Sequence, residues 1–156
     1  MATRSAIGIK HGTVIKAVYC HWDGYMEHNG VILNEFYSNS VDVNRLIATG
    51  DVSSLGACVG EKIDFGHRWE DTDYIKVGET HVAPQCTFYS RDRGEDASFC
   101  TFQTETDFLE HYDHMGAECY YLYDHGVWYV SQHHQNNFQP LHEVLNKETE
   151  QETADA

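Results

Sequence analysis

Basic side chains are scarce in this sequence. Its 156 residues include 10 Lys and Arg against 25 Asp and Glu, which gives a formal net charge of −15 with histidine neutral. A protein that coats DNA or RNA needs a basic face for the phosphates, and binding to an anionic membrane surface has the same requirement. The charge therefore argues against direct nucleic-acid binding and against membrane binding.

Long apolar runs are also missing. No stretch approaches the roughly 20 apolar residues of a membrane-spanning helix, and the first ten residues lack the apolar core of a signal peptide. The five cysteines are odd in number and contain no C-x-x-C pair, which favours buried reduced thiols over a disulfide framework or a zinc site. We therefore expect a protein that stays in the cytoplasm of the cell that makes it.

Common catalytic signatures are absent as well. The sequence contains no Walker loop and no G-x-G-x-x-G, H-E-x-x-H or G-x-S-x-G element. Histidine is abundant, but it occurs as pairs, His111 with His114 and His133 with His134, and not as a spaced triad of metal ligands. We therefore predict no cofactor and no metal site, and the chain is not marked as an enzyme.

The composition that remains is that of a folded domain. A hydrophobic fraction of 41% with 13% aromatic residues is enough for a core, and the length suits one domain of roughly 100–150 residues. We expect a single globular domain over residues 1–140, followed by a short amphipathic segment and an acidic tail over residues 141–156. Five acids and one lysine follow residue 142, so most of the negative charge belongs to the domain.

Alternating apolar residues and turn signals predict two hairpins. The first joins residues 5–10 to 14–22 around His11-Gly12-Thr13, and the second joins residues 119–123 to 127–131 around Asp124-His125-Gly126. Two more strands are predicted at residues 86–90 and 98–103. Residues 51–56 look like a turn-rich connector, and residues 60–85 look like a long irregular excursion because they show no periodicity.

Helices are predicted between these strands. One starts near Asn29, one covers residues 41–49 after a cap at residues 38–40, and one covers residues 105–115 after Thr104. The last would bury Phe108, Leu109 and Tyr112. Because hairpins replace βαβ spacing, the predicted class is α+β, a mainly antiparallel sheet of hairpins packed with two or three short helices.

The densest group of chemically useful side chains is Tyr19-Cys20-His21-Trp22-Asp23-Gly24-Tyr25. In a regular strand His21 and Asp23 would share one face, as a base with its orienting carboxylate. Trp22 and Tyr25 could stack on a planar ligand. The alternative is that Asp23-Gly24 is ordinary turn chemistry and that Trp22 anchors the core.

The second group is Arg91-Asp92-Arg93-Gly94-Glu95. Two arginines in three positions stand out in a chain with so few basic residues. Their guanidinium forks suit a phosphate or a carboxylate, so Arg91 and Arg93 are candidate anion ligands. A local mesh of salt bridges with Asp92, Glu95 and Asp96 explains the pattern equally well.

Several segments together resemble a family of small tailed-bacteriophage proteins. They are the opening Met-Ala-Thr-Arg-Ser, the segment from Tyr19 to Tyr25, Gly50-Asp51-Val52-Ser53-Ser54-Leu55-Gly56, and Cys86-Thr87-Phe88-Tyr89-Ser90-Arg91-Asp92-Arg93-Gly94-Glu95. The resemblance spans about residues 1–131 and does not extend to residues 66–85 or to the acidic tail. It implies a phage origin, hence the cytoplasm of an infected bacterial cell, and it assigns no activity or catalytic residue.

Three functions are compatible with these features. The favoured one is a non-enzymatic protein that binds and inhibits or modulates a host or defence factor, in one version by imitating the phosphates of nucleic acid, because the charge is a property of the whole chain. The second is a pocket for a small anion or nucleotide, as a sponge or small enzyme, that uses Arg91, Arg93, His21 and Asp23. The third is a structural or assembly subunit of a phage, and the oligomeric state is left open.

Overall fold

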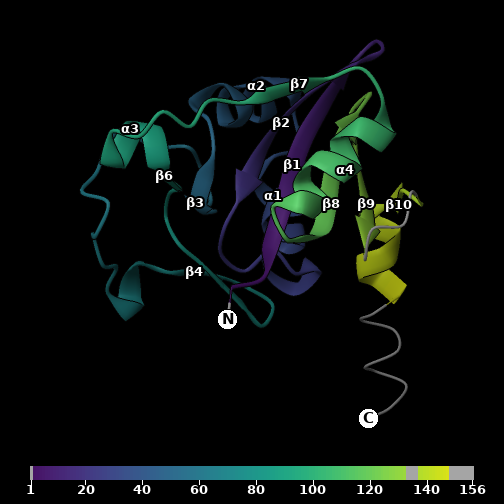
Figure 1. The fold of residues 1–156 in the computed structure, drawn as a ribbon. Helices are drawn as coiled ribbons and strands as arrows, with labels where there is room; N and C mark the ends of the chain where they lie inside the picture. Colours follow the sequence, from purple (N-terminus) through teal and green to yellow (C-terminus); the bar gives the residue numbers. More distant parts are fainter. Residues whose placement is uncertain (1, 133–136, 148–156) are drawn as a thin grey trace.

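A mixed, mainly antiparallel sheet with helices on both faces forms the molecule (Figure 1). The computed structural model describes residues 2–132 and 137–147. The main sheet has eight strands in the order β10-β9-β8-β1-β2-β3-β6, and β7 pairs with β2 beside this path. These strands are β1 (Arg4–His11), β2 (Val14–Cys20), β3 (Val52–Ser54), β6 (Thr87–Phe88), β7 (Cys100–Phe102), β8 (Ala117–Asp124), β9 (Val127–Gln132) and β10 (Gln139–Pro140). The predicted α+β class is confirmed.

The remaining elements are helices and one small hairpin. A second sheet has two strands, β4 (Ile75–Val77) and β5 (Thr80–Val82). Residues 141–147 are also helical. The other helices are η1 (Met26–Gly30, a π-helix), α1 (Val31–Phe36), α2 (Ser40–Thr49), η2 (Asp71–Asp73, a 3-10 turn), α3 (Tyr89–Arg93) and α4 (Glu105–His114).

Both predicted hairpins are confirmed. β1 and β2 pair antiparallel around Gly12, and β8 and β9 pair antiparallel around His125 and Gly126, which both have positive φ. A two-residue loop in which both residues have positive φ matches the right-handed twist of the two strands that it joins. The hairpins join through β1 and β8, which lie parallel.

The sequence-based prediction missed one crossover. The chain leaves β2, passes through η1, α1 and α2, and returns as β3, which lies parallel to β2 with Cys20 opposite Val52. Residues 51–56, expected as a turn-rich connector, therefore contain a strand. Three residues are too few to show alternation, and this strand forms because Val52 is fully buried between its neighbours in the sheet.

Helix α4 covers one face of the sheet, and α1, α2 and residues 141–147 pack on the other (Figure 1). Neighbouring residues of β1 alternate between the two cores, with Ala6 against α4 and Ile7 on the opposite side. The predicted inner face of α4 is confirmed, because Phe108, Leu109 and Tyr112 are all buried. Thr104 caps this helix by accepting a hydrogen bond from the amide of Asp107.

The arginine-rich segment differs from its prediction. Residues 86–90 were expected as a strand that leads into a charged loop, but β6 has only two residues and α3 follows at once. Gly94 ends α3 with φ 74, in the left-handed conformation that glycine adopts readily. Residues 60–85 are largely irregular as predicted, apart from η2 and the small hairpin.

Some predictions concern residues outside the described part of the chain. They are the pair His133 and His134 and the acidic end of the tail, residues 148–156. Within the described part, no helix has the length and apolar character needed to cross a membrane.

The packing of α4 gives a first prediction. Phe108 is fully buried among Phe102, Tyr112 and Tyr120, with ring centroids 5.6 to 6.2 Å apart. Phe108→Ala should lower the free energy of unfolding by about 3–5 kcal/mol, because it removes a large buried ring and leaves a cavity. The exposed Glu110→Ala on the same helix should change it by less than about 0.5 kcal/mol. Urea denaturation of the two variants would measure this, and equal midpoints would contradict the packing.

Candidate functional site

A cleft of about 540 Å³ lies between the end of the first hairpin and the irregular excursion. One wall is the corner after β2 with part of η1, and the floor comes from β3 and β6. The other wall comes from residues 65–83. Its lining residues are Trp22, Asp23, His28, Ser53, Ser54, Leu55, Phe65, His67, Arg68, Trp69, Tyr74, His81, Ala83 and Thr87.

Exposed apolar side chains gather at this cleft. Among the described residues, five large hydrophobic side chains are exposed, namely Trp22 (46%), Tyr25 (41%), Tyr74 (37%), Ile75 (40%) and Val41 (75%). Trp22 and Tyr74 line the cleft, Ile75 follows Tyr74 in the chain, Tyr25 is two residues from the lining residue Asp23, and Val41 belongs to α2. Exposed apolar side chains that gather at one site are typical of binding sites on soluble proteins.

The corner that presents Trp22 is held firmly by backbone contacts. Beyond β2, the amides of His21 and Trp22 still donate to the carbonyls of Val52 and Ser53, each at 3.0 Å. Asp23 then turns the chain in the left-handed region, with φ 57. Strain in a non-glycine residue persists only where the surroundings impose it, and it is common at functional sites.

Gly24 completes the corner because no side chain fits there. A Cβ on Gly24 would lie 2.6 Å from the Cβ of Ser5. Its amide donates to the carbonyl of Thr3 at 2.7 Å, and its carbonyl accepts from the hydroxyl of the buried Tyr121 at 2.7 Å. The corner is thus tied to both β1 and β8.

His21 and Asp23 were expected to pair with each other, but in the structure each interacts with other residues. The Nδ1 atom of His21 shares a 2.7 Å hydrogen bond with the hydroxyl of Tyr19, and the imidazole meets Trp22 edge-on at 4.7 Å. Burial, with a smaller contribution from Arg4, lowers the pKa of His21. Asp23 lines the cleft and interacts with Tyr25, whose pKa is raised by burial and by the charges of Asp23 and Glu27. His21 therefore packs against the ring of Trp22, and Asp23 is the one of the two that lines the cleft.

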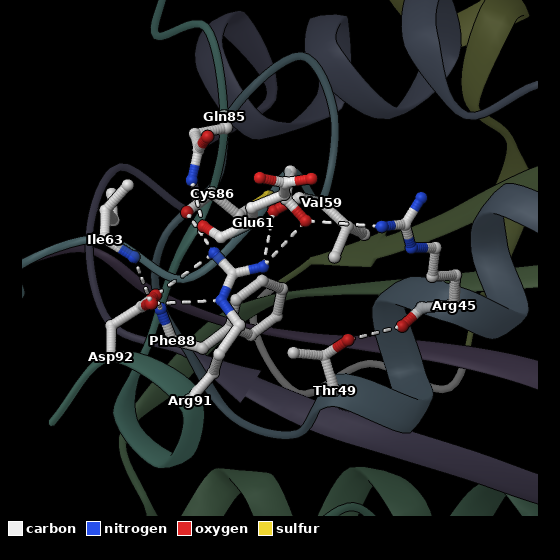
Figure 2. Close-up of polar contacts among 11 residues, drawn as sticks. Arg45, Thr49, Val59, Glu61, Ile63, Gln85, Cys86, Phe88, Arg91 and Asp92 are labelled. Atoms are coloured by element: carbon white, nitrogen blue, oxygen red, sulfur yellow. Dashed lines mark hydrogen bonds and ion pairs between the residues drawn. The ribbon is translucent and has the colours of Figure 1, made fainter. Parts of the chain in front are cut away.

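Arg91 is used inside the protein (Figure 2). A guanidinium has five N–H donors, and here they reach the carbonyls of Val59, Gly60 and Cys86 and both carboxylate oxygens of Asp92 at 2.8 to 3.2 Å. The Asp92 side chain is fully buried and also accepts from the amides of Ile63 and Phe88 (Figure 2). We call Arg91, Asp92 and these backbone partners the arginine latch, since they hold the start of the excursion against β6.

Arg93 is also paired within the chain. It forms a salt bridge with Glu95 at 2.6 Å, and its guanidinium lies 4.4 Å from the ring centroid of Phe65 and 5.0 Å from that of Tyr89. Neither Arg91 nor Arg93 lines the cleft, whereas Trp22 does, and Tyr25 is exposed without being one of the lining residues. The structure thus follows the salt-bridge alternative for the two arginines.

The second wall of the cleft was missed by sequence reasoning. Its members include Arg68, Trp69, Tyr74 and two histidines, all within the segment interpreted as an irregular excursion. The imidazole of His67 contacts Trp69 edge-on at 4.4 Å, as His21 contacts Trp22. The run Phe65-Gly66-His67-Arg68-Trp69 was the available signal, because three rings in five residues are unusual in a polar stretch.

The side chains of the cleft are suited to binding by ring stacking, cation–π contact and hydrogen bonding. Among the described residues, no group of three His, Cys, Asp or Glu side chains is placed to hold a metal ion. His111, which the sequence pairs with His114 by spacing, packs from α4 against the rings of Phe102 and Tyr112.

Comparison with known protein families, with curated proteins and with solved structures found no match.

The strained corner gives an opposed pair of predictions. A left-handed conformation costs a non-glycine residue roughly 1–2 kcal/mol, so Asp23→Gly should leave the free energy of unfolding unchanged or raise it by up to about 1 kcal/mol. Gly24→Ala should lower it by about 2 kcal/mol, because the new methyl overlaps Ser5. Urea denaturation of both variants tests the corner, and a loss of stability in Asp23→Gly as large as that in Gly24→Ala would contradict it.

The arginine latch predicts a pH dependence of stability. Burial alone would raise the pKa of Asp92, but the hydrogen bonds from Arg91 and from two amides outweigh it and hold the pKa below its ordinary value. The unfolded carboxyl titrates near ~3.9, so the stabilisation is complete above that pH and is lost as the pH falls through the lower folded value. Urea midpoints between about pH 6 and 3 should therefore fall more steeply for the wild type than for Asp92→Asn.

Two arginine variants compare the stability contributed by the buried salt bridge of the arginine latch with that of an exposed salt bridge. Arg91→Met leaves Asp92 buried without its cation and should lower the free energy of unfolding at pH 7 by about 3 kcal/mol. Arg93→Met removes an exposed pair and should lower it by less than about 1 kcal/mol. Equal losses in the two variants would show that Arg91 has no special structural role.

Proposed function

We propose that this protein is a non-enzymatic binding protein that engages a basic segment of a partner protein at its aromatic cleft. The observation that carries the proposal is the gathering of exposed aromatic side chains around one cleft on a chain with a net charge of −15. The rings supply contact area, and the carboxylates select the sign of the partner's charge.

Carboxylates are interleaved with the aromatic lining. Between Trp69 and Tyr74 the chain places Glu70, Asp71 and Asp73, all exposed. Over residues 61–81 acidic side chains outnumber basic ones by six to three. Charge of one sign around a cleft raises the rate at which an oppositely charged partner arrives. This part of the surface therefore favours a cationic ligand.

The rings can hold such a cation at short range. A lysine or arginine side chain over the face of Trp or Tyr gains about 0.5–1 kcal/mol at an exposed site and about 2 kcal/mol when water is excluded. Trp22 and Tyr74 line the cleft from opposite walls, and Asp23 adds a carboxylate beside Trp22. A basic side chain that enters the cleft would meet both kinds of partner.

The proposed partner is a host or defence protein in the cytoplasm of an infected bacterium, because the sequence resembles a phage family. A nucleic-acid-binding enzyme fits this chemistry, since its phosphate-binding face is basic. On this proposal the carboxylates stand in for phosphates, and the cleft receives a lysine or arginine that would otherwise contact nucleic acid. Occupation of that face inhibits or modulates the partner.

A second candidate ligand is a nucleotide or another planar anion. It is supported by Arg68, which lines the cleft among the rings of Trp69 and Phe65. The two arginines first considered as anion ligands do not support it, because Arg91 donates to the protein's own groups and Arg93 pairs with Glu95. Stacking on aromatic rings would still accommodate a base.

The cleft predicts which variants lose binding. A fluorescent peptide of alternating lysine and glycine, followed by anisotropy at low salt, should bind the wild type, and Trp22→Ala and Trp69→Ala should each weaken it by about tenfold. Val41→Ala is the matched control, because it removes an exposed apolar side chain far from the cleft. Its affinity should equal that of the wild type, and added salt should weaken binding of the peptide to the wild type and to all three variants.

Two outcomes would contradict this function. If both tryptophan variants bind the peptide as the wild type does, the cleft is not the binding site. If the wild type binds ATP but not the peptide in the same assay, the nucleotide alternative holds and the protein-partner proposal fails.

A further inference from the structure

The imidazole of His28 occupies a defined position in the cleft. His28 belongs to the π-helix η1 and lines the cleft. π-Helical turns are rare and are frequently found at functional sites. The Nδ1 atom of His28 lies 2.9 Å from the Oδ1 atom of Asn29, the next residue, which is fully buried.

The contacts of Asn29 determine which way its amide group faces. Its Nδ2 atom lies 3.3 Å from the Oγ of Ser5, 3.3 Å from the Sγ of Cys20 and 3.4 Å from the carbonyl of Trp22. A hydroxyl or thiol can donate or accept, but a carbonyl can only accept. The amide nitrogen therefore faces Trp22, and Oδ1 faces His28.

This orientation fixes the tautomer of His28. An amide oxygen cannot donate a hydrogen bond, so Nδ1 of His28 carries the proton and Nε2 of the neutral ring carries the lone pair. Among the described residues Nε2 has no hydrogen-bond partner. The cleft thus contains an oriented acceptor beside its aromatic rings.

We propose that Nε2 of His28 accepts a hydrogen bond from an N–H group of the bound cation, so that the cleft selects lysine or arginine over cations without N–H. The inference rests on the proposed function and names its ligand chemistry. An ammonium group can donate an N–H to an imidazole lone pair, whereas a trimethylammonium group has no N–H to donate. Cation–π contact alone makes no use of this difference.

The experiment uses two peptides that differ only in their N–H groups. One contains alternating lysine and glycine, and the other contains trimethyl-lysine at each lysine. At pH 8 the wild type should bind the lysine peptide about tenfold more tightly, the typical value of a hydrogen bond to a charged group.

Two variants of His28 test the acceptor. His28→Gln retains one donor and one acceptor, so it should keep the preference for lysine. His28→Phe retains a ring without an acceptor and should bind both peptides equally. Urea denaturation confirms that each variant is folded before its affinity is compared.

The outcomes distinguish the two proposals. Binding of both peptides by the wild type with equal affinity at pH 8 would overturn the role of His28 and leave the binding function standing. A preference that persists in His28→Phe would overturn it equally. Failure of the folded wild type to bind either peptide at pH 8 would overturn the proposed function itself.

Discussion

The cleft depends on the five hydrogen bonds of a single guanidinium. The excursion that forms one wall has little regular structure, and the strands at this edge of the sheet have two or three residues each. Arg91 and Asp92 supply what a longer ladder of strand hydrogen bonds would otherwise provide, because together they engage the backbone of residues 59, 60, 63, 86 and 88. Charge-assisted bonds are stronger than neutral ones, and lysine has too few donors in too compact a group to replace the fork.

The opposite wall is also held by a buried polar side chain, which here is uncharged. Asn29 is buried and connects β1, β2 and the corner after β2 through one side-chain amide. Each wall is therefore held by a buried polar group whose partners lie far apart in the sequence. Such networks rigidify a structure when all their members are satisfied. Rigid walls hold the exposed Trp22 and the half-buried Trp69 in defined positions, which lowers the entropy lost when a ligand binds.

The parts of the fold that could be predicted are those governed by local pattern. The hairpins and α4 follow from alternation, turn residues and the cap at Thr104, which act over a few neighbours. The cleft could not be predicted from local pattern, because its walls come from segments that meet only in the folded chain. An arginine fork suits a bound phosphate and a distant backbone carbonyl equally well, so sequence could not decide the role of Arg91. The aromatic run around Trp69 shows no periodicity, so the sequence indicated a loop there and not a binding surface.

On the proposed function, charge and shape have separate tasks. A net negative charge attracts every basic protein, and its influence on exposed groups fades over a Debye length of about 8 Å at physiological ionic strength. Selection among basic partners must therefore come from contacts shorter than that. The two tryptophan rings and the oriented lone pair of His28 act at this range, and each is positioned by a neighbouring side chain. The acidic surface thus raises the rate at which basic partners arrive, and the cleft determines which of them stay bound.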